Sequence, residues 1–372
     1  MITVKEVHTK KELRSFVKFP FKLYSDSEYW VPPIIRQEIR TFDKNVNPVF
    51  HDAEARYFLA FRNDEIVGRI AAIINWMEVK GQSIKKMRFG WFDFEDDFAI
   101  SEALLDKVYE IGKANELEFM EGPVGFTNLD KVGVITEGFD HIGSMITWYN
   151  HPYYESHYDH HGFKFAKKYL ESKFLFSDIN PESFRKIQSL IKRRYHLKSL
   201  NFKTNNEILE YADDMFDVFS RSHAVLSSFV EINNEQREYF KKKFINFLNP
   251  EYVKFVTDKD DKLIAFAIVT PSYAEAMQKM KGKLFPLGIK HLLRAKKYHK
   301  SVTFYLIGIL PEYQNKGVTA IIFDEYYKEF EKKGVIECIR GPELADNTAI
   351  HQIWKHFNPK VHKRRCTYRK SI

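Results

Sequence analysis

The sequence predicts an α/β protein that contains two copies of one domain, and three observations support this prediction. The segment EFMEGP at residues 118–123 returns about 220 residues later as ECIRGP at residues 337–342. An Asn follows each copy at the same spacing, as Asn128 and Asn347. A β-hairpin pattern also precedes each copy. Because supersecondary units that recur in one order indicate a repeat, the two halves are expected to share one fold.

The composition is typical of a packed globular protein. The chain has 372 residues, whereas single cores rarely grow beyond about 250–300 residues. Hydrophobic residues make up 44% of the chain and aromatic residues 16%, which is enough to fill two cores and excludes a disordered chain. No apolar run reaches the roughly 18 residues that span a bilayer, and no secretory segment is evident at the N-terminus. A cytoplasmic location is therefore expected.

The net charge and the number of cysteines exclude only some classes of binding partner and fold. A net charge of +8 is compatible with a polyphosphate cofactor, an anionic membrane surface or RNA. We expect no DNA partner, and no RNA-binding motif accompanies the basic runs. The two cysteines, Cys338 and Cys366, are too few for a disulfide framework. We interpret them as buried thiols in neighbouring strands of one sheet.

The first copy is expected over residues 1–178. Alternating apolar residues predict its strands, and apolar residues three and four apart predict its helices. The sequence Asn63-Asp64-Glu65 predicts the hairpin turn, and Gly162 is expected to end the last helix. In order, the expected elements are a strand at 2–7, helices at 11–24 and after Pro32 and Pro33, a hairpin at 57–74, a strand at 87–94, a helix at 100–111, and then a strand at 118–121, a helix at 153–161 and a strand at 163–176.

The second copy is expected over residues 197–372, after a basic connecting helix within residues 179–196. It repeats the order of the first copy, with a Lys- and Leu-rich insertion at residues 272–300. The expected elements are a strand at 198–202, helices at 207–222 and 235–247, a hairpin at 252–270, a strand at 301–310, a helix at 319–332, a strand at 335–339, a helix at 348–357 and a strand at 362–368. No Gly- and Ser-rich linker separates the copies, so they are expected to pack together.

A strand, a turn and a helix in the second copy form a candidate phosphate-binding loop. An apolar strand ends at Pro311, Gly317 permits a tight backbone path, and an apolar helix begins near Ala320. Such a turn directs several backbone N–H groups and a helix N-terminus at one point, which suits a pyrophosphate. Lys316 adds a positive charge.

This loop resembles the acyl-CoA-binding motif of the GNAT superfamily of N-acyltransferases, usually written Gln/Arg-x-x-Gly-x-Gly/Ala. The resemblance covers about residues 197–372, and the first copy shares it through the internal repeat. It implies two tandem GNAT-like domains, each a mixed, mostly antiparallel central sheet flanked by helices. The whole chain also resembles a bacterial group of tandem GNAT-like proteins that carry the WVPP segment, here at residues 30–33, and a hairpin matching residues 67–73.

The resemblance assigns roles to individual residues. It implies that Ile309 and Leu310 offer backbone groups to the pantetheine arm and that Asn347 contacts the cofactor near its thiol. It implies that the pyrophosphate is wrapped by Gln314, Asn315, Lys316, Gly317, Val318 and Thr319. Acetyl-CoA or a longer acyl-CoA would be the co-substrate, and no metal is expected.

Two departures from the family pattern affect the expected chemistry. Thr319 occupies a position where the family prefers Gly or Ala. Trp354 stands seven residues after Asn347, where many members place a Tyr that protonates the thiolate, and indole cannot do so. Tyr305 and Tyr368 are candidates for that acid. Glu337 is a candidate base, although its twin Glu118 in the other copy favours a structural role.

The first copy is not expected to bind CoA. Residues 92–99 occupy the place of the phosphate loop there, contain no glycine and carry four carboxylates that would repel a pyrophosphate. We expect this copy to supply a wall of the acceptor pocket or to stabilise the interface.

The predicted function is N-acyl transfer from acyl-CoA to an unidentified primary amine by direct attack on the thioester. Two alternatives remain open. One is a non-catalytic acyl-CoA-binding protein, suggested by Trp354. The other is an aminoacyl or lipid acyltransferase acting at tRNA or at a membrane surface, suggested by the basic insertion.

Overall fold

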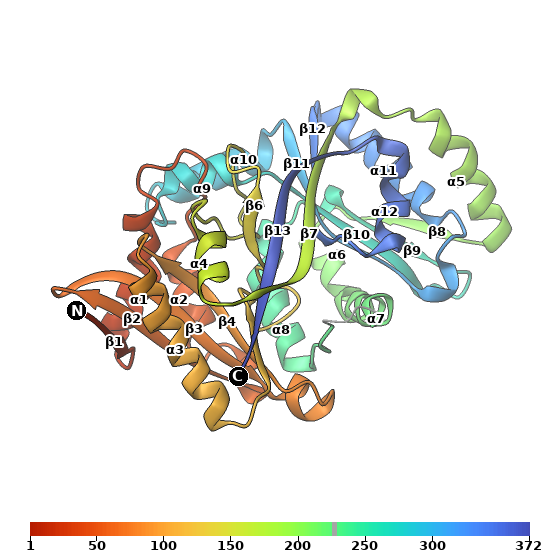
Figure 1. The fold of residues 1–372 in the computed structure, drawn as a ribbon. Helices are drawn as coiled ribbons and strands as arrows, with labels where there is room; N and C mark the ends of the chain where they lie inside the picture. The colour runs from red at the N-terminus through yellow and green to blue at the C-terminus, as the bar shows by residue number, and fades with distance from the viewer. Residues whose placement is uncertain (225–228) are drawn as a thin grey trace.

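The structure, a computed structural model, describes residues 1–224 and 229–372. Its strands are β1 (Ile2–Glu6), β2 (Ala53–Arg62), β3 (Glu65–Asn75), β4 (Lys86–Phe94), β5 (Phe119–Gly122), β6 (Val134–Glu137), β7 (Lys164–Leu175), β8 (Lys198–Asn201), β9 (Val253–Thr257), β10 (Leu263–Pro271), β11 (Ser301–Ile309), β12 (Glu337–Leu344) and β13 (Lys360–Ser371). Within the described residues they form one sheet of order β1-β2-β3-β4-β5-β13-β7-β12-β11-β10-β9-β8, and β6 pairs with β13. Two helix-covered lobes therefore share one continuous sheet (Figure 1).

The helices pack on both faces of this sheet. They are α1 (Lys10–Leu23), α2 (Ile35–Thr41), α3 (Phe98–Ala114), α4 (Tyr154–His160), α5 (Glu182–Tyr195), α6 (Asn205–Glu210), α7 (Ala212–His223), α8 (Asn234–Phe244), α9 (Ala274–Met280), α10 (Gly288–Lys297), α11 (Val318–Lys333) and α12 (Thr348–Trp354). In the first half α3 covers one face of β1 to β5, and α1 lies against β2, β3 and β4. No helix in the described parts of the chain is long and apolar enough to cross a bilayer.

The predicted order of elements is confirmed, with several local differences. The expected helix at 207–222 is two helices, α6 and α7, because the backbone leaves the helical region at Tyr211. The expected helix at 235–247 ends as α8 at Phe244 and continues as a 3-10 turn. Strand β6 has four residues and was not predicted. The hairpin turn is as expected, since Asn63 and Asp64 both have positive φ, at 48° and 65°.

The two halves exchange strands at the centre of the sheet. Strand β7 ends the first half in sequence, yet it pairs with β12 of the second half. Strand β13 ends the chain and lies between β5 and β7, antiparallel to both. Figure 1 shows β7 and β13 running side by side through the middle of the molecule. The boundaries predicted at 178 and 197 stay a prediction, since hydrogen-bonded strands cross between the two segments.

This exchange corrects the placement of the cysteines. Cys338 lies in β12 and Cys366 in β13, and β7 separates these two strands. Both thiols are buried and free, as expected. Burial raises the pKa of both thiols, which favours the unreactive protonated form.

A buried ion pair joins the exchanged strands. Arg365 of β13 is 0% exposed and its Nε donates to Glu171 of β7, which is 3% exposed. Arg365 also donates to the carbonyl of Gly133 at 3.3 Å. Burial alone would raise the pKa of Glu171, but the positive charges of Arg365 and Lys363 outweigh it and hold this pKa below its usual value. The pair is therefore charged in the folded protein at neutral pH.

The insertion predicted at 272–300 folds as the helices α9 and α10. Met277 and Met280 of α9 pack against Val31 and Ile34 of the first half. The side chain of Gln278 donates to the carbonyls of Glu28 and Trp30, at 2.7 and 3.0 Å. The insertion thus packs against the WVPP segment, residues 30–33, of the first half.

Replacing Arg365 by Met tests whether the central ion pair holds the two halves together. Arg365→Met leaves Glu171 buried without its main partner, which is expected to cost about 3–5 kcal/mol of unfolding free energy. Because burial then raises the pKa of Glu171 above the usual value of about 4.3, the cost should shrink as the pH falls from neutral toward about 4. Urea unfolding at neutral and acid pH measures both effects.

The double variant Glu171→Met/Arg365→Met is the matched control. It removes both charges and should recover much of the lost stability. A single variant as stable as the wild type would show that the pair does not stabilise the central strands.

Candidate active site

A gap opens between β11 and β12 because the two strands part after a short parallel pairing. They pair from Ser301 and Glu337 as far as Phe304 and Arg340. Beyond that point β12 pairs only with β7 in the described structure. A bulge lies at Tyr305, since its neighbours Phe304 and Leu306 pair with consecutive residues of β10. The bulge turns the end of β11 away from β12.

The free edge of β11 presents backbone groups to this gap. The N–H of Leu310 donates to the carbonyl of Ile264 on β10, at 3.0 Å. Since antiparallel residues alternate between bonded and open edges, the N–H and C=O groups of Ile307 and Ile309 face the gap instead. The N–H of Leu310, expected to be open, is therefore occupied, whereas the N–H of Ile307 faces the gap. Gln314 confirms which edge is open, because its amide donates to the carbonyl of Ile309 at 3.1 Å.

The predicted phosphate loop lies at the mouth of the gap. Asn315 and Gly317 have positive φ, at 57° and 77°, and α11 begins at Val318. Within the described structure no acceptor is bonded to the N–H groups of residues 315–319. These unbonded donors lie at the N-terminus of α11, where the helix dipole favours a negative charge. The groove there is lined by Ser222, His223, Ile307, Gly308, Ile309, Tyr313, Gln314, Asn315, Gly317, Val318, Thr319, Asn347, Ala349, Ile350, Gln352, Ile353 and Lys355.

Helix α5 supports the back of the loop. A Cβ on Gly317 would lie 3.2 Å from Ile191 of α5, so this glycine permits close packing as well as a positive φ. Lys316 is exposed, and its ammonium lies 5.4 Å from the ring centres of Tyr195 and Tyr313. Lys316 is placed beside the groove rather than within its lining.

A chamber of about 250 Å³ continues the groove into the protein. The two spaces share His223, Ile307, Asn347 and Ile350. Asn347 caps α12 by accepting from the N–H of Ile350 at 3.2 Å, which fixes its side chain at the junction. Glu343 and Leu344, which follow the second copy of the repeat, line the chamber, and Asn347 lines both the chamber and the groove.

His223 is the residue at this junction that the sequence did not indicate. Its Nδ1 lies 3.0 Å from the carbonyl of Phe219 and 2.9 Å from the hydroxyl of Ser222. Burial lowers its pKa, so the ring is neutral near pH 7. With Nδ1–H donating to the carbonyl, Nε2 carries the lone pair and bonds no described residue. The helix predicted at residues 207–222 stopped one residue short of His223, which is the last residue of α7, so the sequence did not single it out as a candidate base.

Trp354, which stands where many members of the family have a Tyr, is hydrogen-bonded to Glu343. The indole N–H of Trp354 donates to the carboxylate of Glu343 at 3.2 Å, and Arg340 donates to the same carboxylate. Trp354 is buried, and the guanidinium of Arg340 lies 4.8 Å from its ring centre. Burial raises the pKa of Glu343 although Arg340 opposes it. Trp354 thus holds a carboxyl group in the chamber wall and donates no proton to a thiolate.

The structure brings only one of the three proposed catalytic side chains to the chamber. Tyr305 lines it, and burial raises the pKa of its phenol, which therefore stays protonated. Tyr368 lies in the core of the first half, where it donates to Glu155 at 2.9 Å. Glu337 pairs with Lys173 at 3.1 Å at the start of β12, outside the lining of the chamber and the groove.

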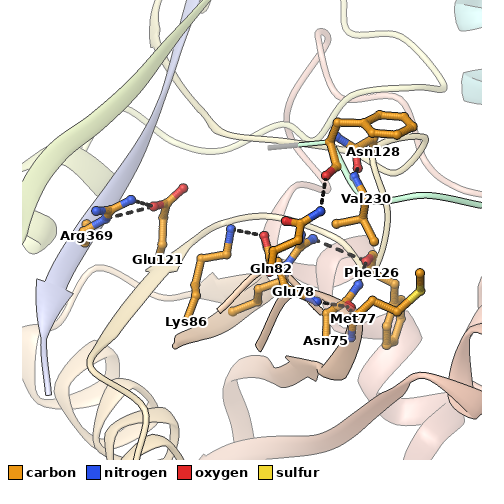
Figure 2. A network of polar contacts seen from close by, with 12 residues as sticks. Asn75, Met77, Glu78, Gln82, Lys86, Glu121, Phe126, Asn128, Val230 and Arg369 are labelled. Atoms are coloured by element: carbon orange, nitrogen blue, oxygen red, sulfur yellow. Dashed lines mark hydrogen bonds and ion pairs between the residues drawn. The ribbon is translucent and has the colours of Figure 1, made fainter. Parts of the chain in front are cut away.

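The first half supplies the opposite wall of the chamber. Lys86 and Arg88 of β4 both line it and both contact the buried carboxylate of Glu78, at 2.5 and 2.7 Å. Glu121 of β5 lines it too and pairs with Arg369 of β13 at 2.5 Å (Figure 2). The lining also includes Lys131 and Lys167, and no ion pair of the described structure involves either of them. Lys86 and Arg88 share one carboxylate, and two lysines without an ion pair face one further carboxylate of this half, Asp130, so cations outnumber anions here although burial lowers the pKa of both lysines.

Figure 2 also shows how the two walls are joined. The amide of Gln82 donates to the carbonyl of Phe229 at 2.7 Å, and the N–H of Val230 donates to Asn128 at 3.0 Å. Phe229 lines the chamber. Asn128, the repeat twin of Asn347, therefore binds the other half of the chain instead of capping a helix.

The equivalent gap in the first half is closed. The N–H of Val124 donates to the carbonyl of Phe89 at 2.8 Å, and a Cβ on Gly90 would lie 2.4 Å from the carbonyl of Val124. Trp91, at the matching bulge, packs against Phe126 and Trp148. The helix that follows begins with the carboxylate of Asp97 as its cap. Backbone contacts and aromatic rings thus fill the space that a pantetheine arm would need.

An apolar groove extends from the chamber toward the insertion. It shares Leu129, Asp130, Lys131, Ile146 and Tyr305 with the chamber. Its other walls include Trp91, Met145, Phe244, Phe247 and Met277. A long apolar group fits this groove better than a polar one.

The histidines of α4 are held by the fold. His157 and His161 each lie 2.7 Å from the hydroxyl of Ser101, and His157 also contacts Asp96 at 3.0 Å. These bonds attach α4 to α3, which gives the histidines a packing role.

Comparison with known proteins gives two curated relatives. The chain is 22% identical over 370 residues to Protein YghO of Escherichia coli, covering 98% of this chain and 94% of that protein. It is 23% identical over 318 residues to a bacterial ceramide synthase of Caulobacter vibrioides, covering 84% and 82%. No protein-family model matches the chain.

Solved structures resemble the whole chain. A tandem GNAT protein from the clavulanic acid biosynthesis pathway matches 100% of this chain and 98% of its own, with a TM-score of 0.58 at 8% identity. A GCN5-related N-acetyltransferase from Sphaerobacter thermophilus matches 100% and 95%, with a TM-score of 0.52 at 9% identity. The split strands, the loop and the repeated order agree with this likeness, and the chain has the tandem GNAT fold.

Proposed function

We propose that the protein is an N-acyltransferase that moves an acyl group from acyl-CoA to a primary amine. The observation that carries the proposal is the groove between β11 and β12, which runs from the unbonded N–H groups at α11 to the chamber beside His223. A pyrophosphate fits the first end and a thioester the second. The first half, whose own gap is closed, is proposed to form the acceptor wall.

The acyl-CoA is proposed to bind along the free edge of β11. Residues 314–319 surround the pyrophosphate, and Gly317 keeps the backbone close to it. The N–H and C=O groups of Ile307 and the N–H of Ile309 are proposed to bond the pantetheine amides, since the carbonyl of Ile309 already accepts from Gln314. Asn347 lies at the thiol end.

His223 is proposed as the general base. The amine nitrogen attacks the thioester carbonyl, so that a C–N bond forms and the carbonyl oxygen gains negative charge. The N–H of Ile307 is placed to stabilise that charge, and the neutral Nε2 of His223 takes the proton from the attacking nitrogen. The C–S bond then breaks, and the proton held by His223 passes to the leaving thiolate. Tyr305, whose phenol stays protonated because burial raises its pKa, is proposed to donate a hydrogen bond to that sulfur, and the products are an amide and free CoA.

The acceptor is proposed to be an amine that carries a long apolar group. The apolar groove leading from the chamber supports this choice. One relative is a bacterial ceramide synthase, and a ceramide is the amide of a long-chain amino alcohol. A non-catalytic acyl-CoA-binding protein would bind CoA without turnover, and an aminoacyl-tRNA enzyme would transfer from tRNA instead.

Gly317→Glu tests the phosphate site. The new carboxylate would meet the pyrophosphate, so CoA affinity measured by calorimetry should fall at least tenfold, or about 1.4 kcal/mol. Gly334→Glu is the matched control because Gly334 caps the other end of α11, also with positive φ. Both changes should lower the unfolding free energy by about 1–2 kcal/mol.

The two variants separate folding from binding. Loss of affinity in Gly317→Glu alone supports the site. Equal CoA binding by Gly317→Glu and the wild type would place the cofactor elsewhere.

His223→Gln tests the base. It should lower kcat with an acyl-CoA and a long-chain amine by about 100-fold or more, with little change in CoA affinity. Because burial lowers the pKa of His223, the wild-type rate should hold down to below about pH 6.5 and fall in more acid solution. The rate of the variant should not show this fall in acid solution.

The control is His351→Gln, on α12 outside the lining of the chamber and the groove. It should keep the wild-type rate and pH profile. A full rate in His223→Gln would remove His223 from the mechanism.

A further inference from the structure

In the hairpin of α9 and α10, the segment from the end of α9 through α10, residues 279–300, carries an excess of positive charge equal to the net charge of the whole protein. Residues 279–300 contain eight of the 58 Lys and Arg residues and none of the 50 Asp and Glu residues. The rest of the chain therefore carries equal numbers of both signs. The cations are Lys279, Lys281, Lys283, Lys290, Arg294, Lys296, Lys297 and Lys300.

These cations have no acidic partner in the described structure. Lys296 and Lys300 donate only to backbone carbonyls, at 3.3 and 3.4 Å, and Lys297 lies 5.1 Å from the ring centre of Tyr298. The basic helix α5 differs, because Arg185 pairs with Glu182 and Lys192 with Glu325. The positive charges of the hairpin are thus not neutralised by ion pairs within the described residues.

Large apolar side chains project to solvent among these cations. Phe285 is 65% exposed, Leu287 64%, Leu293 59% and Tyr298 67%. The opposite side of the hairpin is packed, since Met277, Met280 and Leu292 lie in the cluster with Val31 and Ile34. The hairpin therefore has a fixed inner face and an outer face that is both apolar and basic, at the periphery of the molecule (Figure 1).

We propose that this outer face is a docking surface for an anionic lipid bilayer. Lys290, Arg294 and Lys297 are spaced about one turn apart on α10 and would contact lipid phosphates. Leu287 and Leu293 would enter the boundary between the headgroups and the acyl chains. Aliphatic side chains contribute nothing to the phosphate and stacking contacts by which RNA is bound, so the leucines favour a membrane.

Docking would place the apolar groove next to the membrane. Met277 of α9 lines that groove, and the outer face of the same hairpin carries the exposed leucines. The proposal does not rest on the acyl-transfer function, because vesicle binding is measured without CoA or turnover.

The test is flotation of the full chain with vesicles of phosphatidylcholine, with and without phosphatidylglycerol. The wild type should bind the anionic vesicles at least tenfold more tightly than the neutral ones, and added salt should weaken that binding. Lys290→Glu/Arg294→Glu/Lys297→Glu should lower the affinity by about 100-fold. Leu287→Ser/Leu293→Ser should also lower it, at unchanged net charge.

The matched control is Lys10→Glu/Lys11→Glu/Arg14→Glu, which changes the net charge equally on exposed positions of α1. It should keep vesicle binding, and thermal melting of each variant checks folding. No vesicle binding by the wild type, or equal losses in both triple variants, would overturn the proposal. Salt-sensitive binding of tRNA that is lost in the α10 charge variant and kept in the leucine variant, without vesicle binding, would assign the face to RNA instead.

Discussion

The pairing of β7 with β12 is the contact on which the candidate site depends. Strand β12 can leave β11 after four residue pairs because β7, from the other half of the chain, satisfies its opposite edge. Without that partner, β12 would expose a row of unpaired backbone groups or stay closed against β11. The gap proposed to hold the cofactor is thus maintained by a strand from the half whose own gap is closed.

The same exchange brings the two walls of the chamber together. Strand β13 lies between β5 and β7, so Arg369 meets Glu121 and Arg365 meets Glu171. These bonds fix the positive wall of the first half opposite His223 and Asn347 of the second. The two halves share one order of strands and helices but differ at the gap between their central parallel strands. In the first half Val124 bonds Phe89 and closes this gap, and in the second half the gap is open. Duplication followed by loss of one gap explains how a repeat yields one site with two different walls.

Local patterns in the sequence were enough to predict most elements and the loop. The hairpins follow from alternating apolar residues, and Gly317 between a strand and a helix marks the phosphate loop, because these signals lie within a few residues of one another. The strand exchange was not predictable, since the pairing of β13 with β5 joins residues about 250 apart with no local mark.

The catalytic side chains were the weakest part of the prediction for the same reason. His223 becomes a candidate base only in the folded chain, where α7 places it in the chamber lining beside Ile307. Tyr368 is no longer a candidate acid, because β13 pairs with β5 of the first half and places Tyr368 away from the chamber. The sequence identified Trp354 as a departure from the Tyr of the family pattern, but the hydrogen bond of Trp354 to Glu343 required the folded geometry.

Hydrogen exchange of the full chain with and without acyl-CoA tests the central claim most directly, because it reports on both halves at once. If one open gap holds the cofactor, residues 305–320 should gain protection on binding while residues 89–99, at the closed gap of the first half, should not change. Protection of the first-half segment, or an unchanged second-half loop at saturating acyl-CoA, would contradict the assignment of the site.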